Sequence, residues 1–126
     1  MISLLVWCVE YSAHILCHFS MHADPGYIQL GILQHIPANS RCFLTIDFDV
    51  LDPSIMPAVG APTPGGLDYQ TTIELIHALA ARNTIVGVCL VEFIPQADLH
   101  NLGAVTAMRI VWNIIGVLAR NQPKIT

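Results

Sequence analysis

The sequence predicts an α/β fold in which helices cover a parallel sheet. Two short apolar runs, residues 42–46 and 84–93, each carry acidic residues at the carboxyl end, as buried strands of a parallel sheet often do. A helical pattern lies between them, and a strongly apolar helical pattern follows at residues 105–118. The resulting order of strand, loop, helix, strand, loop and helix is that of a βαβ crossover followed by a covering helix.

The chain changes in pattern near residue 37. Residues 1–37 form a poorly patterned amino-terminal segment, in which residues 2–9 predict one buried strand, whereas residues 38–126 are strongly patterned. We interpret the first segment as a remnant of missing strand–helix units, or as a replacement for them. We expect it to pack less well and to expose apolar surface. Whether Met1 is the natural start is left open.

The connection between the two later strands contains a loop and a helix. Residues 50–68 include seven prolines and glycines, a density that neither a helix nor a strand tolerates. Thr71-x-x-Glu74 is a capping-box pattern and predicts the start of a helix of about 12 residues. The pair Arg82-Asn83 is typical of a helix end.

The composition limits the classes to which the protein can belong. Of the 126 residues, 54% are hydrophobic and 11% are charged, against about 25% charged in an average domain. Such a chain either crosses a membrane or has apolar surface that another segment or subunit covers. No apolar stretch has the length and the freedom from polar residues that a spanning helix needs, so we expect no membrane. We therefore expect one domain that associates, as a homo-oligomer for example.

Charge and cysteine spacing exclude further classes. The net charge is −4 with five lysines and arginines in all, so the basic footprint of a nucleic-acid binder is missing. The four cysteines include no C-x-x-C pair, and Cys42 and Cys89 lie within the apolar runs. We interpret them as reduced, buried thiols, and we predict a cytoplasmic location.

Asp47 and Asp49 are the residues that point to chemistry. Two residues apart in an extended strand, they project from the same face, where their charges repel each other. A cation between them relieves this repulsion, and carboxylate ligands favour hard ions such as Mg²⁺ or Mn²⁺. The alternative is structural: the two acids cap a loop or the next helix. Glu92, at the end of the second strand, is expected at the same edge of the sheet.

The acidic pair begins a longer motif. The string TIDFDVLDPSIMPAVGAPTPGGL, residues 45–67, resembles the signature of the ureohydrolase family, which includes arginases and agmatinases, in the spacing of its acids, prolines and glycines. The resemblance continues through VEFIP at residues 91–95 and covers residues 38–120. It implies the carboxyl-terminal part of a three-layer α/β/α arginase-like fold with a parallel sheet.

The resemblance also implies roles for the acids. Asp47 and Asp49 become ligands of manganese, with two ions in the complete family site, and Glu92 becomes the group that binds the substrate guanidinium. The implied reaction is the manganese-dependent hydrolysis of a small guanidino compound, agmatine-like, to urea and an amine. Paired hydrogen bonds to Glu92 hold the guanidinium carbon over a water that the metals activate. No further catalytic residue is assigned.

Three residues depart from the family pattern. Phe48 stands where a smaller aliphatic residue is usual, and Ile94 stands where the family has asparagine. Ala61 replaces a threonine whose hydroxyl lies near the substrate in relatives. The departure at Ala61 leaves the substrate open among agmatine, arginine, another guanidino acid and a formimino compound.

The upstream ligands of the family, part of a D-x-H-x-D motif, have no clear match. The nearest string is residues 20–24, SMHAD, which makes His22 and Asp24 alternative ligands. His14, His18 and His22 recur every four residues and would share one face of a helix. The segment also has the pattern of a strand, in which the three side chains would not form one compact metal-binding group. A truncated, inactive ureohydrolase-like fragment is therefore the alternative to an enzyme. We expect the chain alone to bind Mn²⁺ weakly and to hydrolyse no guanidino compound.

Overall fold

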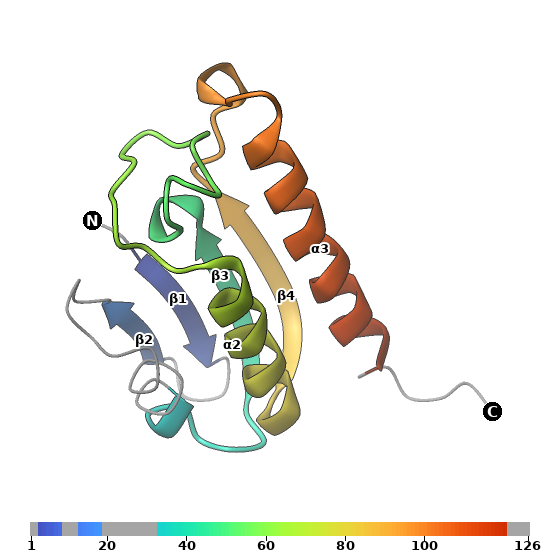
Figure 1. The fold of residues 1–126 in the computed structure, drawn as a ribbon. Helices are drawn as coiled ribbons and strands as arrows, with labels where there is room; N and C mark the ends of the chain where they lie inside the picture. Colours follow the sequence, from blue (N-terminus) through green and yellow to red (C-terminus); the bar gives the residue numbers. More distant parts are fainter. Residues whose placement is uncertain (1–2, 9–12, 19–32, 121–126) are drawn as a thin grey trace.

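The computed structural model describes residues 3–8, 13–18 and 33–120, and it describes side chains within residues 33–120. Four strands form one sheet in the order β2-β1-β3-β4, with α2 in front of the sheet and α3 beside it (Figure 1). The elements are β1 (Ser3–Cys8), β2 (Ala13–His18), β3 (Arg41–Asp47), α2 (Tyr69–Arg82), β4 (Thr84–Val91) and α3 (Leu102–Arg120), with 3-10 turns η1 (Phe48–Val50) and η2 (Pro95–Ala97).

The predicted crossover is present. β3 and β4 are parallel neighbours, paired from Arg41 with Thr84 to Asp47 with Val91, and α2 connects them. The strand predicted over residues 2–9 is also present as β1, but it runs antiparallel to both β2 and β3. The sheet is therefore mixed, because the parallel arrangement among the described strands is confined to the pair that a helix connects.

The predicted start of α2 was wrong by three positions, because the N-cap is Asp68 and not Thr71. Its N-cap is Asp68, whose carboxylate accepts a hydrogen bond of 2.6 Å from the Thr71 amide. Asp68 outcompetes the capping box because an aspartate at the N-cap also interacts favourably with the positive end of the helix dipole. The predicted end was confirmed: α2 stops at Arg82, whose guanidinium donates to the Leu33 carbonyl at 2.8 Å.

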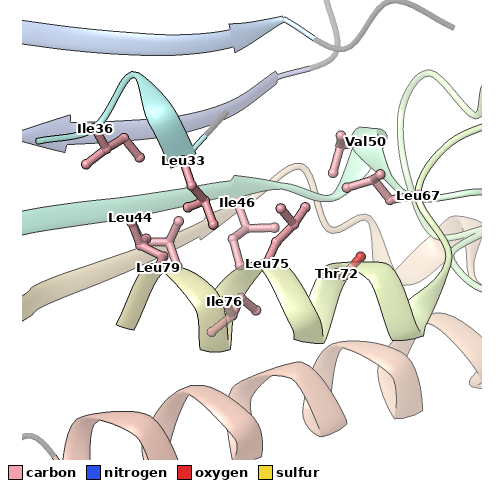
Figure 2. A pocket seen from close by; sticks show the side chains of 10 residues that line it. All are labelled: Leu33, Ile36, Leu44, Ile46, Val50, Leu67, Thr72, Leu75, Ile76 and Leu79. Carbon is pink, nitrogen blue, oxygen red and sulfur yellow. The ribbon is translucent and has the colours of Figure 1, made fainter. Parts of the chain in front are cut away.

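The core lies between β3 and α2. Leu44 and Ile46 of β3 face Leu75 and Leu79 of α2, and Figure 2 shows them lining a small cavity. Its volume is about 20 Å³ and its lining is apolar apart from Thr72. A cavity of this size admits at most one water, which would find few polar partners there. It is a packing gap, and the functional site must lie elsewhere.

Much apolar surface stays exposed, as the composition predicts. On the sheet face away from α2, Phe43 is 39% exposed and Cys89 is exposed, so the expectation of a buried Cys89 was wrong. The outer side of α3 presents a stripe of large apolar side chains: Leu102, Val105, Met108, Trp112 and Ile115. The expectation that no stretch is long and apolar enough to cross a membrane was wrong for α3. The helix meets that test by length and composition, as core helices also do, and its inner side is buried in the core.

The glycine pair of the long loop is required by a close backbone approach. Leu51 and Leu67 form an isolated parallel bridge, and the Leu67 amide donates to the Val50 carbonyl at 2.8 Å. A Cβ atom on Gly66 would lie 2.6 Å from the backbone nitrogen of Asp52 and 2.7 Å from the Val50 oxygen. Only glycine fits here, which explains the glycine position in the sequence motif.

We expect Gly66→Ala to lower the free energy of unfolding by about 1–3 kcal/mol, because the backbone must move to admit the methyl group. Gly116→Ala is the matched control: Gly116 lies inside α3 with open space around its Cβ position. Helix propensity predicts that this control raises stability by about 0.5–1 kcal/mol. Urea denaturation of the two variants checks both values, and equal effects would contradict the packing argument.

Candidate active site

Asp47 and Asp49 lie at the carboxyl end of β3 but not in one extended strand. Asp47 ends the strand, and Asp49 sits inside the 3-10 turn η1. The Asp49 amide donates a 2.9 Å hydrogen bond to Oδ1 of Asp47. The expectation of two carboxylates on one face of an extended strand was therefore wrong, because Asp47 caps a turn. The capping alternative is observed, and it uses one oxygen of Asp47.

The surroundings of Asp47 disfavour its negative charge. Burial raises the pKa of Asp47; the hydrogen bond from the Asp49 amide works against this rise, and the negative charge of Asp49 adds to it. Both carboxylates are partly exposed. Desolvation together with a neighbouring like charge is an arrangement that a bound cation would relieve.

Glu92 reaches the same edge through the strand pairing. Asp47 pairs with Val91, so Glu92 is the first residue beyond the partner of Asp47. Its backbone is left-handed, with φ of 63°, a conformation that costs a non-glycine residue about 1–2 kcal/mol. The side chain is exposed. Backbone strain of this kind is concentrated at functional sites, where the surrounding structure holds it in place.

The loop after η1 touches both acidic groups. The Ala61 amide donates to Oδ1 of Asp49 at 3.3 Å. A Cβ atom on neighbouring Gly60 would lie 3.8 Å from Oε2 of Glu92, which places that carboxylate beside the loop. Asp49 and Glu92 thus lie beside the same short stretch of backbone, and Asp47 is hydrogen-bonded to the Asp49 amide at the carboxyl edge of the sheet.

None of the histidines among the described residues forms a metal-binding group with these acids. Within the described parts of the chain, no three side chains of His, Cys, Asp or Glu come together as a metal-binding group. His14 and His18 belong to strand β2, so they do not form a helical stripe. His22 and Asp24 lie outside the described residues.

The described residues fit a divalent cation in part. Asp47 and Asp49 each use Oδ1 to accept a backbone hydrogen bond, which leaves Oδ2 of each as the atom suited to a metal. Carboxylate oxygens suit hard ions such as Mn²⁺, which prefer about six oxygen or nitrogen ligands. Two carboxylates supply a minority of such a shell, so a two-ion centre needs ligands from elsewhere.

Asp52 holds the loop together, a role that the sequence analysis missed. Its Oδ1 accepts from the Ser54 amide and its Oδ2 from the Gly65 amide, both at 2.9 Å. The Ser54 hydroxyl and these two amides lower the pKa of Asp52. The Asp-Pro-Ser sequence could have predicted the local turn, but not the contact with Gly65.

The lowered pKa of Asp52 makes its contribution to stability depend on pH. A carboxylate with a folded-state pKa below its unfolded value stabilises the fold above the unfolded value, and this stabilisation is lost as pH falls through the folded value. We expect Asp52→Asn to be less stable than the parent at about pH 7, and we expect the difference to be smaller at about pH 3, below the ordinary carboxyl pKa of about 4. Chemical denaturation at both pH values measures the difference. A difference independent of pH would show that the carboxylate charge has no part in it.

Comparison with known proteins places this geometry in a family. Residues 14–116 match the arginase family. The chain is 40% identical over 77 residues to the N(1)-aminopropylagmatine ureohydrolase of Thermus thermophilus, covering 61% of this chain and 26% of that protein. It is 36% identical over 100 residues to the formimidoylglutamase of Klebsiella pneumoniae, covering 79% of this chain and 30% of that protein.

The fold agrees with the sequence match. The arginase from Bacillus subtilis superposes with a TM-score of 0.66 at 28% identity, covering 78% of this chain and 36% of that structure. The predicted α/β class, as the carboxyl-terminal part of an arginase-like fold, is thereby confirmed. The chain spans 26% and 30% of the lengths of the two curated relatives above. The family match covers most of the sequence and includes all three acids of the site: the chain belongs to the arginase family of hydrolases.

Proposed function

We propose that this chain carries the carboxylate ligands and the substrate-anchoring acid of a manganese-dependent amidine hydrolase. The observation that carries the proposal is the convergence of Asp47, Asp49 and Glu92 at the carboxyl edge of β3 and β4. The carboxyl ends of parallel strands are where α/β proteins bind their ligands.

The three acids divide into two tasks. Asp47 and Asp49 would hold manganese through their Oδ2 atoms, and the metal, when bound, supplies Lewis-acid activation of water. The exposed carboxylate of Glu92 would accept two hydrogen bonds from one amidine group. The left-handed backbone of Glu92 has to be held in place by the structure around it, and such a held turn would position the acceptor before the substrate arrives.

The substrate class is a linear amidine of small size. Agmatine-like guanidino compounds are the first choice, because the Thermus relative is named for an agmatine derivative. A formimino compound is the second choice, supported by the Klebsiella formimidoylglutamase and by the small Ala61 beside Asp49. Both compounds present paired N–H groups to a carboxylate, so Glu92 serves either.

An inactive fragment is the competing function. It is favoured by the lack of a third metal-binding side chain near Asp47 within the described residues. In that case the chain retains the geometry of the edge but turns over no substrate unless another polypeptide supplies the missing ligands. Location in the cytoplasm, self-association and the lack of a membrane or nucleic-acid partner remain proposals under either function.

Titration of the purified chain with Mn²⁺ tests the metal site. We expect weak binding that Asp47→Asn or Asp49→Asn abolishes, because each removes one of the two ligands. Asp68→Asn is the matched control: Asp68 is also an aspartate that accepts a backbone hydrogen bond, but its partners are Thr71 and Thr72 of α2. Electron paramagnetic resonance of free Mn²⁺ gives the affinity. Binding that survives both ligand substitutions would overturn the proposal.

A measurement of urea release distinguishes an active enzyme from an inactive fragment. We expect the chain alone to release no urea from agmatine above background, because two carboxylates do not complete a two-ion centre. Release that Asp47→Ala abolishes would show instead that residues beyond those described complete it.

A further inference from the structure

Two aromatic rings connect the turn that bears the acidic pair to the turn that bears Glu92. Phe48 lies between Asp47 and Asp49 in η1 and is 2% exposed. Phe93 follows Glu92 directly and packs against the core. The ring centroids are 6.1 Å apart with an interplanar angle of 75°, an edge-to-face contact. The backbone joins Phe48 to the turn of the acidic pair and Phe93 to the turn of Glu92. The contact between the two rings therefore connects the two turns.

A single backbone hydrogen bond continues this connection. The Ile94 amide donates to the Ala58 carbonyl at 2.7 Å, so the chain is held on the far side of Phe93 as well. Ile94 also approaches Gly60, where an added Cβ would lie 3.4 Å from its Cδ1 atom. Glu92 itself has no comparable anchor, because its side chain is exposed and its backbone is left-handed. The position of Glu92 thus depends on the residues that follow it.

We propose that Phe48 and Phe93 are positioning residues that hold the left-handed turn of Glu92 at a fixed place relative to Asp47 and Asp49. Leucine at position 93 would fill similar space but would lack the edge-to-face geometry that locks the turn. The functional part of this inference rests on the proposed function, because it concerns the distance from the substrate-anchoring acid to the metal ligands. Its structural content can be measured without turnover.

Nuclear magnetic resonance of the isotope-labelled full chain tests the turn directly. The readouts are the backbone shifts and the HN–Hα coupling of Glu92, which report φ, and the hydrogen-exchange rate of the Ile94 amide. We expect Phe93→Leu to lose the left-handed signature and to speed exchange at Ile94 by about tenfold or more while core amides such as Leu44 keep their protection. Phe93→Tyr keeps the ring and is expected to rescue both readouts.

Phe43→Leu is the matched control, because Phe43 is a partly exposed phenylalanine on the sheet face away from α2. It should leave Glu92 and Ile94 unchanged. Two results would overturn the inference. The first is an unchanged Glu92 signature in Phe93→Leu, and the second is faster exchange at Ile94 and Leu44 alike, which would show general loss of packing.

Added Mn²⁺ distinguishes a failure of this inference from a failure of the proposed function. In the parent chain, Mn²⁺ at Asp47 and Asp49 should broaden the amide signals of both Asp49 and Glu92. In Phe93→Leu the broadening should persist at Asp49 and weaken at Glu92. If Mn²⁺ broadens neither signal in the parent chain, the proposed metal site fails, while the shift, coupling and exchange data still decide whether the ring pair holds Glu92.

Discussion

Parallel pairing between β3 and β4 is the constraint on which the candidate site depends. The crossover through α2 forces both strands to point the same way, so their carboxyl ends meet at one edge. The register then places Glu92 one residue beyond the partner of Asp47. The α2 helix itself is fixed at both ends, by Asp68 at its start and by the contact of Arg82 with the Leu33 carbonyl at its end. The site is thus a consequence of strand direction rather than of loop flexibility.

The acids of this edge have structural as well as chemical uses. Asp47 caps η1, Asp49 accepts from the loop at Ala61, and Asp52 connects the turn to Gly65. Asp47 and Asp49 each accept a backbone hydrogen bond at Oδ1, whereas Asp52 accepts one at each of its two oxygens. These hydrogen bonds explain why a run of prolines and glycines can be ordered without forming a helix or strand.

The exposed apolar surface is consistent with a partial arginase-family fold. Parallel strands are normally covered on both faces, yet here Phe43 and Cys89 lie on an exposed face of the sheet, and α3 presents Trp112 with 65% of its surface exposed. The chain spans about a third or less of the two curated relatives described above. The low charge content of the sequence agrees with this exposed apolar surface.

The sequence by itself determined the family and the order of elements from residue 41 onward, because hydrophobic period and the spacing of prolines and glycines are local properties. It did not determine that Asp49 lies in a turn, since a 3-10 turn and a strand end share the same short pattern. The choice of Asp68 over Thr71 as the cap, and the contact of Phe48 with Phe93, were likewise decided by the tertiary structure. These features depend on which distant segments meet, and a one-dimensional pattern does not carry that information.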